Sequence, residues 1–205
     1  TLLQRRVAKA LKPILRDPDL GDHVVAAVGT LDGTGGDWTS GKGVFLPAST
    51  TKVLTVAAAL AHLGPEARFS TRVMTGTSPR EVVLVGGGDP YLASKALTPE
   101  EQASVYPVRA DLDALASATA AAHDRRRIKV TYSDGLFNGP TASPRWRADY
   151  IPDDVVSPIT ALMVDGGRLA DGFERAEDPS LWAAQEFARA LTEAGLEVIG
   201  RPEPV

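Results

Sequence analysis

The sequence predicts a mixed α/β or α+β fold, because segments with helical and with strand-like hydrophobic spacing follow one another along the chain. Its 205 residues are enough for one large domain or two small ones, and can bury a core without disulfides or a structural metal. With 43% hydrophobic and 23% charged residues, the composition is that of a globular chain, not of a disordered or fibrous one.

The first segments are expected to form a helix and a β-hairpin. Residues 2–16 carry apolar side chains at helical spacing, and Pro13 is expected to kink this helix or end it early. Residues 23–31 are strand-like and lead into a glycine-rich turn at residues 32–37. The short run around Trp38 is therefore expected to pair back on that strand.

The best-defined helix opens near Pro47 and runs through Leu63, where a Gly-Pro pair ends it. After this helix the hydrophobic period changes to two. Residues 69–73 alternate between apolar and polar side chains, which predicts a half-buried strand. Residues 81–85 are apolar enough to predict a strand that is buried on both faces.

The middle of the chain alternates between regular and irregular segments. Residues 94–110 have no clear period and are expected to form a long surface loop. An alanine-rich helix is expected over residues 111–123, and a strand over residues 128–132. Residues 133–158 are rich in proline, glycine and aspartate, which predicts a loop that a ligand can reach.

The last helix is marked at both ends. Asp178 is the expected N-cap, Pro179 the first helical residue, and Gly195 lies just past the end. The residues expected to face the core are Leu112, Leu115 and Ala122 in the alanine-rich helix, and Leu181, Ala184, Ala188 and Leu191 in the last one.

Charge and composition exclude several function classes. The formal net charge of −4 argues against an electrostatic surface for nucleic acid, so we expect no nucleic-acid partner. The absence of cysteine excludes disulfides, thiol nucleophiles and thiolate metal sites. Because the chain begins at Thr1 and shows no signal-type apolar segment, we interpret it as a processed or trimmed product.

The strongest candidate for a catalytic site is the tetrapeptide Ser49-Thr50-Thr51-Lys52, at the start of a predicted helix. Side chains three residues apart on a helix lie on one face and can touch. A serine hydroxyl becomes a good nucleophile when a base removes its proton, and a desolvated lysine amine can be that base. The free N–H groups at a helix start favour a developing oxyanion. The pattern therefore fits a serine–lysine acyl-transfer site.

A purely structural interpretation of the same residues is also open. In it, Ser49 is a helix N-cap and Lys52 is a solvated residue of the first turn. Lysine in a first turn is slightly unfavourable for the helix dipole, which argues weakly against this interpretation. Since a Ser-x-x-Lys spacing is a weak signal by itself, the spacing alone does not decide between the two.

Three other features predict no ligand site. The glycines at residues 86–88 lack the lysine and Ser/Thr of a phosphate-binding loop, and Asp89 places a negative charge beside them, so a structural turn is expected. The histidines show no metal-ligand spacing. The basic cluster at residues 125–127 follows a predicted helix end, where solvated cations complement the dipole.

Five segments, in order along the chain, resemble one known family. They are PASTTK at 47–52 with LGP at 63–65, RFSTRV at 68–73, VLVGGGDP at 83–90, YSDGLF at 132–137 with GP at 139–140, and SPITAL at 157–162. Together they resemble the serine-type D-alanyl-D-alanine carboxypeptidases of the class C, low-molecular-mass penicillin-binding proteins. The resemblance runs from about residue 20 to the C-terminus.

The resemblance implies a chemistry for the site. In that family the serine matching Ser49 attacks the carbonyl between the last two D-alanines of a peptidoglycan stem peptide, and the lysine matching Lys52 is the base. β-Lactam antibiotics acylate the same serine. Endopeptidase cleavage is a further activity that the resemblance allows. No metal or organic cofactor is implied, and the substrate implies an exported, extracytoplasmic enzyme in the periplasm or cell wall.

The resemblance also implies a fold: α+β, with a β-lactamase/D,D-peptidase-like catalytic domain that is incomplete here and a large inserted α/β domain. Residues 1–74 resemble the first catalytic segment, and residues 75–205 resemble the insertion. The family completes its site with a Ser-x-Asn motif and a Lys-Thr-Gly-type strand. This chain has neither, since its only asparagine, Asn138, lacks the serine and no lysine begins such a triplet.

We therefore interpret the chain as the N-terminal part of a larger enzyme, inactive alone, whose missing C-terminal part is a required partner. The rival interpretation is a non-catalytic cell-wall-binding or scaffold module of the same fold, and the missing motifs support it. A reading frame that continues into the Ser-x-Asn and Lys-Thr-Gly motifs would favour the enzyme, and a frame that ends at Val205 would favour the rival interpretation.

Overall fold

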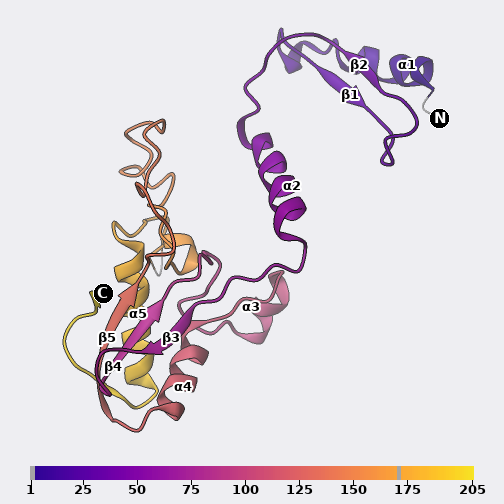
Figure 1. The fold of residues 1–205 in the computed structure, drawn as a ribbon. Helices are drawn as coiled ribbons and strands as arrows, with labels where there is room; N and C mark the ends of the chain where they lie inside the picture. Colours follow the sequence, from indigo (N-terminus) through magenta and orange to yellow (C-terminus); the bar gives the residue numbers. More distant parts are fainter. Residues whose placement is uncertain (1–2, 170–171) are drawn as a thin grey trace. The chain divides into compact units, whose positions relative to one another are not determined.

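The computed structural model describes residues 3–169 and 172–205, and the chain divides into two compact units, Thr1–Glu66 and Ala67–Val205 (Figure 1). Both units combine helices with β-strands, so the α+β class is confirmed. The division at residues 74 and 75 concerns the two parts of the family's architecture and stays a prediction. Within the described residues, every helix is too short or too polar to span a lipid bilayer.

The first unit contains a short hairpin and two helices. Its elements are α1 (Gln4–Ile14), the 3₁₀ turn η1 (Pro18–Leu20), β1 (Ala26–Val28), β2 (Trp38–Ser40), the 3₁₀ turn η2 (Ala48–Thr50) and α2 (Thr51–Leu63). The predicted pairing around Trp38 is confirmed, because β1 and β2 are antiparallel with Val28 opposite Trp38. α1 ends one residue after Pro13, as expected for a proline inside a helix.

The first unit has no hydrophobic core of its own among residues 3–66, because none of their side chains is buried. The exposure of apolar side chains is most marked in α2, which is apolar over most of its length. Val53 is 64% exposed and Leu54 is 70% exposed. A helix this apolar is normally buried against other elements.

The second unit is a twisted sheet with helices on one face. Its elements are β3 (Arg72–Thr75), β4 (Glu81–Val85), α3 (Pro99–Ser104), α4 (Leu112–Ala122), β5 (Arg127–Ser133), the 3₁₀ turn η3 (Asp165–Gly167), α5 (Pro179–Glu193), β6 (Glu197–Val198) and β7 (Glu203–Pro204). The strand order is β3-β4-β5-β6, and β7 also pairs with β5. β3 is antiparallel to β4, whereas β4, β6 and β7 are each parallel to β5.

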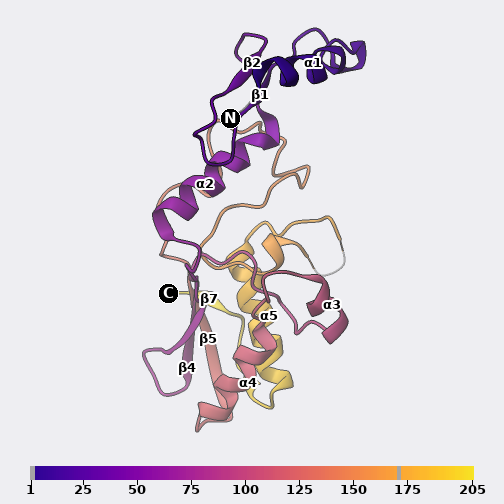
Figure 2. The same ribbon diagram turned by 90° about the vertical axis from the view of Figure 1, so that its right-hand side faces the viewer.

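α4 and α5 cover the same face of this sheet (Figures 1 and 2). The core cluster between them consists of Val82, Leu84, Leu92, Leu112, Ala116, Ile128, Val130, Tyr132, Leu162, Val164, Ala183, Ala184, Phe187, Ala190, Leu191 and Leu196. The prediction that residues 81–85 are buried on both faces is wrong. Val82 and Leu84 are buried, but Val83 and Val85 on the other face are only half-buried, because helices cover one side only.

Two predictions for the middle of the chain need correction. Residues 94–110 include the helix α3, which a capping box begins: Glu101 N–H donates to Thr98 Oγ1, and Thr98 N–H donates to the Glu101 carboxylate. In α4 the buried residues are Leu112 and Ala116, whereas Ala122 at the end of the helix is exposed. Local spacing thus predicted the burial of Leu112 but not the exposure of the last turn of α4.

The end signals of the last helix are confirmed. Asp178 accepts a hydrogen bond from Leu181 N–H at 2.9 Å, Pro179 is the first helical residue, and Gly195 has the positive φ of a helix stop. Its buried stripe includes Ala184 and Leu191 as expected. Leu181 and Ala188 are only half-buried, and the stripe is completed instead by Ala183, Phe187 and Ala190.

Candidate functional site

Ser49 and Lys52 lie in contact at the start of α2. η2 ends at Thr50 and runs directly into α2, so the serine and the lysine are separated by about one helical turn. Lys52 Nζ donates to Ser49 Oγ at 3.4 Å. The structure thus brings together the two residues that the sequence singled out as nucleophile and base.

The serine hydroxyl does not cap the helix. The N-cap position is Pro47 for η2 and Thr50 for α2, and no side-chain hydrogen bond is made from either. Ser49 therefore does not have the capping function of the purely structural interpretation, and its hydroxyl faces lysine instead of the helix backbone.

The backbone just before the serine has an unusual conformation. Ala48 has a φ of +45°, in the left-handed region that side chains other than glycine rarely adopt. Pro47 before it has right-handed dihedrals, and its carbonyl accepts from Thr50 N–H at 2.9 Å. No local signal in the sequence predicts this conformation of Ala48, because alanine normally favours a right-handed helix.

Both candidate side chains are exposed to solvent. An amine works as a general base only in its neutral form, which burial or nearby cations favour. Among residues 3–66 no side chain is buried, so this unit does not itself exclude water from the pair. The serine–lysine contact is present, but residues 3–66 do not form the water-excluding walls that an acyl-transfer site needs.

The segment directly after β5, which begins at Asp134, has a structural role. Asp134 directly follows β5, and its carboxylate accepts from Ser180 Oγ at 2.9 Å. Ser180 is buried at the start of α5, and its hydroxyl is also within 3.2 Å of the Leu162 carbonyl. These contacts join the end of β5 to α5, so this serine and carboxylate belong to the packing of the second unit.

The glycines at residues 86–88 allow close approach of neighbouring backbone. A Cβ atom on Gly86 would lie 2.4 Å from the Ala161 carbonyl oxygen, and one on Gly87 would lie 2.1 Å from the Ser70 carbonyl oxygen. Gly88 N–H donates to the Ala161 carbonyl at 2.8 Å. The absence of side chains thus explains this turn without a bound phosphate.

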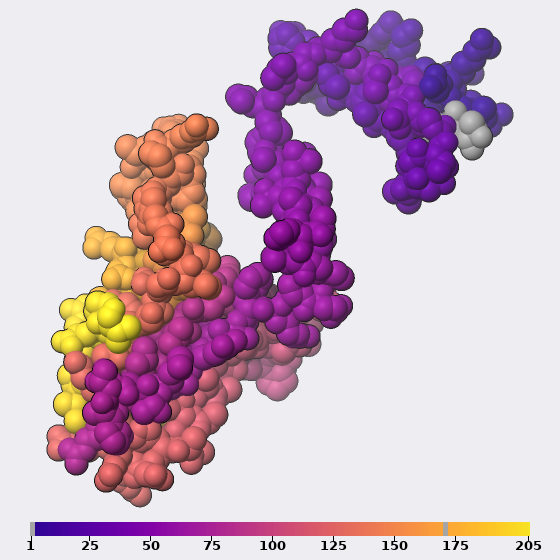
Figure 3. All heavy atoms as spheres, viewed as in Figure 1, coloured from indigo at the N-terminus to yellow at the C-terminus, as the bar shows by residue number. Residues whose placement is uncertain are grey.

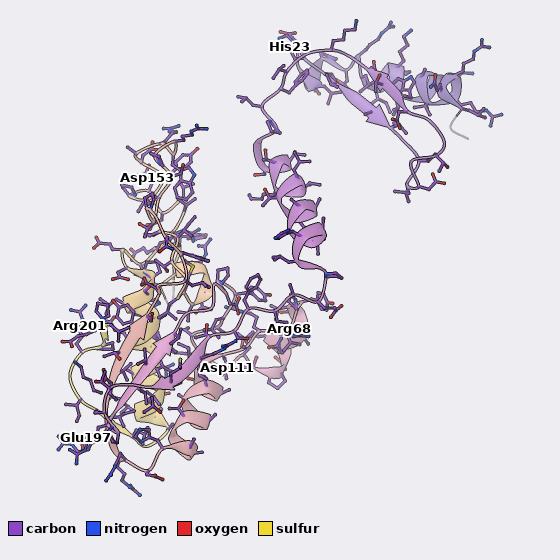
Figure 4. All side chains as sticks on the ribbon, viewed as in Figure 1. His23, Arg68, Asp111, Asp153, Glu197 and Arg201 are labelled. Carbon is purple, nitrogen blue, oxygen red and sulfur yellow. The ribbon has the colours of Figure 1, made fainter. Side chains whose placement is uncertain are left out.

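Residues 134–158, which make up most of the loop expected at residues 133–158, project from the second unit (orange in Figure 3). Asp153 lies on it, at the opposite end of the unit from Glu197 (Figure 4). A hollow of about 460 Å³ opens against the loop, with Phe137, Trp146 and Ile159 among its lining residues. The prediction that a ligand can reach this loop therefore agrees with its projection from the unit and with the hollow beside it.

Arg175 holds the base of that loop in place. Its Nε donates to the Asp154 carbonyl at 2.8 Å, and its Nη1 donates to Ser157 Oγ at 3.0 Å. Burial, and then the positive charge of Arg168, lower the pKa of Arg175. The guanidinium is engaged by the protein itself, so we assign it a structural role.

The chain can be assigned to a family on the sequence that surrounds this site. A sequence model of the D-Ala-D-Ala carboxypeptidase 3 (S13) family matches residues 7–177, which include Ser49, Lys52 and most of the second unit. The chain belongs to this D-Ala-D-Ala carboxypeptidase family. The resemblance noted from the five sequence segments is thereby confirmed at the level of the family.

Three relatives are similar to this chain over most of its length, and each of them is much longer than the chain. It is 36% identical to a carboxypeptidase of Mycobacterium tuberculosis over 197 residues, which is 90% of this chain and 40% of that protein. It is 35% identical to the carboxypeptidase DacB of Mycolicibacterium smegmatis, covering 93% of this chain and 42% of that protein. It is 32% identical to a D-alanyl-D-alanine carboxypeptidase of an Actinomadura strain, covering 77% and 28% respectively. The chain thus spans well under half the length of these relatives.

Proposed function

We propose that the chain is the N-terminal part of a penicillin-binding D-alanyl-D-alanine carboxypeptidase, with Ser49 as the nucleophile and Lys52 as the base. The observation that carries the proposal is the Lys52 Nζ to Ser49 Oγ contact at the start of α2, inside the region that matches the family. The family membership supplies the reaction class, and the contact supplies the pair of side chains that the reaction needs.

The reaction divides into acylation and hydrolysis. In acylation, Lys52 removes the hydroxyl proton of Ser49, and Oγ bonds to the carbonyl carbon between the last two D-alanines of a stem peptide. The carbonyl oxygen becomes an oxyanion near the Ser49 N–H. The C–N bond then breaks, and the terminal D-alanine leaves as the amine after taking a proton. Water hydrolyses the ester and frees Oγ for the next turnover.

The incomplete site supports the proposal that the enzyme is longer than this chain. The relatives are more than twice as long, and the apolar helix α2 is exposed along the first unit. We expect residues 1–74 to be the first segment of a β-lactamase/D,D-peptidase-like catalytic domain, and residues 75–205 to be a domain inserted into it. A C-terminal part would then cover α2 and supply the Ser-x-Asn and Lys-Thr-Gly-type groups.

The expected ligands follow from the same site. Peptidoglycan stem peptides are the proposed substrates, and β-lactam antibiotics would acylate Ser49 because they mimic the terminal dipeptide. Cleavage of a cross-linked stem peptide, an endopeptidase reaction, would use the same acylation step. Since this substrate lies outside the cytoplasmic membrane, we propose an extracytoplasmic location.

The second candidate function is a non-catalytic cell-wall-binding or scaffold module. The observation in its favour is that the sequence contains neither of the two remaining family motifs. In this case the Ser49–Lys52 contact would be retained from the family's fold but would catalyse no reaction.

Covalent labelling with a fluorescent penicillin separates the two functions. The complete protein should be labelled, and peptide mapping should place the label on Ser49. The Ser49→Ala variant should lose the label, whereas Ser70→Ala, the same substitution at an exposed serine of the second unit, should keep it.

Two results would contradict the enzyme proposal: no labelling of the complete protein, or labelling that survives in Ser49→Ala. The 205-residue chain alone serves as a further control. It should label far more slowly than the complete protein, because its serine–lysine pair is open to water.

A further inference from the structure

We propose that a hollow in the second unit is a further ligand site, which binds a carboxylate attached to a small apolar group, as at the C-terminus of an acylated alanine. The hollow has a volume of about 430 Å³ and lies where β4 ends, with Arg68, Arg72 and Gly87 among its lining residues. The residues that line it all belong to the second unit, so the site is built without Ser49 or Lys52.

The register of the sheet places Arg72 beside the hollow. Arg72 begins β3 and lies opposite Val85, the last residue of β4. Cross-strand partners have their side chains on the same face, and Val85 lies on the face that α4 and α5 leave uncovered. Arg68, four residues earlier in the chain, lines the same hollow (Figure 4). Two guanidinium groups therefore share one hollow on the open side of the sheet.

The protein does not balance the charge of these two arginines. Among the described residues, neither Arg68 nor Arg72 forms an ion pair, and no acidic residue lines the hollow. The acidic side chains of the adjoining loops are engaged elsewhere. Asp89 accepts a backbone N–H of its own loop at 2.9 Å, and Asp134 accepts from a serine hydroxyl of α5 at 2.9 Å. A bound anion would supply the missing negative charge.

Another pair of arginines shows that such a surface does not always favour an anion. Arg125 and Arg126 also line a hollow, of about 580 Å³, but Asp124 lines it with them. That hollow lies where α4 and α5 end, and the C-terminal ends of helices favour cations. The protein itself therefore accounts for those two charges. Among the described residues around the hollow of Arg68 and Arg72, none belongs to a helix.

The other lining residues indicate the kind of anion. A guanidinium group can donate two parallel N–H bonds to a carboxylate. Gly87 adds a donor, because its N–H is bonded to no described residue, whereas those of Gly86 and Gly88 donate to carbonyls at 2.9 and 2.8 Å. Phe69 and Leu136, which are 55% and 59% exposed, supply apolar surface. A free amino acid fits less well, since the guanidinium groups repel its ammonium group.

This site differs from the phosphate-binding loop that the sequence excludes at residues 86–88. Such a loop carries its own lysine, whereas here the cations come from β3 and from the segment before it. The biological source of the ligand rests on the proposed function, because the terminal D-alanine of a stem peptide has the required chemistry. A second stem peptide bound here would raise the effective concentration of the polymer at the enzyme.

The test is an NMR titration of the ¹⁵N-labelled 205-residue chain with N-acetyl-D-alanine, on the Ser49→Ala variant so that the proposed nucleophile takes no part. The amide signals of Arg72 and Gly87 should shift and saturate at a concentration on the order of millimolar. N-acetyl-D-alaninamide, which lacks the carboxylate, should shift them much less. Inorganic phosphate, which lacks the apolar group, should bind more weakly than N-acetyl-D-alanine.

Substitution of the arginines tests their role directly. Arg68→Gln and Arg72→Gln should each weaken binding by about fivefold or more, because each removes a charge-assisted contact. Arg80→Gln, the same substitution at another exposed arginine of the second unit, is the matched control and should change the dissociation constant by less than about twofold. Since all three positions are exposed, the variants should keep the unfolding midpoint of the parent chain.

Three results would overturn the inference: no saturable shift, equal binding of the amide, or a dissociation constant that Arg68→Gln and Arg72→Gln leave unchanged. Phosphate that binds as tightly as N-acetyl-D-alanine would overturn the choice of a carboxylate. Binding should persist in the complete protein with Ser49→Ala, and its loss there would mean that another part of the protein covers the hollow. A complete protein that penicillin does not label would contradict the proposed function alone, because this titration needs no reactive serine.

Discussion

The turn at residues 30–35 shows how single polar side chains stabilise a unit that lacks a core. Thr34 donates to the Asp32 carboxylate twice, from its N–H at 3.1 Å and from its hydroxyl at 2.8 Å, while Gly35 N–H donates to Thr30 Oγ1 at 2.9 Å. The Thr30 hydroxyl, and then the N–H and hydroxyl of Thr34, lower the pKa of Asp32 to about 2. The hydrogen bonds of the turn therefore stabilise the charged form of the Asp32 carboxylate.

A pH dependence of this turn follows from that shift. The pKa of Asp32 is lower in the folded turn than the ordinary value of about 3.9, so its contribution is complete above pH ~4 and is lost as the pH falls toward 2. In the complete protein, where α2 is expected to have a covering partner, carboxyl NMR titration should therefore give a midpoint for Asp32 near 2. Thr30→Val should raise it, whereas Thr39→Val, outside the turn, should not. A midpoint near 3.9 for Asp32 in the unsubstituted complete protein would contradict this assignment.

Among the elements, α5 combines clear local end signals with polar contacts to a neighbouring helix. Its residue Arg189 donates to Glu186 at 2.9 Å and to Asp113 of α4 at 3.2 Å, which joins α5 to α4. At its start, the Asp178 carboxylate accepts Leu181 N–H. Because the first N–H groups of a helix have no partner within it, this cap stabilises the whole element.

Removal of that cap should destabilise the second unit. We expect Asp178→Ala to lower its free energy of unfolding by about 1 kcal/mol, because one N–H at the start of α5 loses its acceptor. Asp178→Asn should lose much less, since asparagine is also a good N-cap. Urea unfolding followed by far-ultraviolet circular dichroism measures both variants. Equal stability of the alanine and asparagine variants would show that the cap contributes nothing.

The same elements show how far local sequence predicts structure. Helix ends are encoded locally, which is why the limits of α5 could be predicted and why the Thr98-x-x-Glu101 signal of α3 was present, although the lack of periodicity around it obscured it. Burial on the second face of β4 could not be predicted. It depends on whether other segments cover that face, and a run of apolar residues does not contain this information.

At the candidate site, too, some features could be predicted from the local sequence and others could not. The Ser49–Lys52 contact follows from helical spacing alone and could be predicted. The backbone of Ala48 could not, because it opposes the intrinsic preference of alanine. The exposure of both side chains could not be predicted either, since it depends on whether other described residues pack on α2 and not on any property of the tetrapeptide.

On the scale of the whole molecule, hydrophobic burial is divided unequally between the two units. Every member of the core cluster lies between residues 82 and 196, and all of them belong to the second unit. The first unit orders its backbone without burying a side chain among residues 3–66. Ordering a chain costs roughly 1–2 kcal/mol per residue in backbone entropy, and burial of apolar area is the main term that offsets it.

The second unit should therefore fold alone, and the first should not. A fragment of residues 67–205 is expected to unfold cooperatively in urea at the same midpoint as the core of the whole chain, because it retains the complete cluster around Leu84 and Phe187. A fragment of residues 1–66 should show little helicity and no cooperative transition, since the apolar side chains of α2 have nothing to pack against.

Two leucine substitutions in the 205-residue chain test the same difference between the units. Leu84→Ala should lower the free energy of unfolding by about 2–5 kcal/mol, whereas Leu54→Ala, at a 70% exposed position, should change it by about 0.5 kcal/mol or less. Cooperative unfolding of the 1–66 fragment, or equal effects of the two leucine substitutions, would mean that the first unit has a core of its own, and α2 would then need no covering partner.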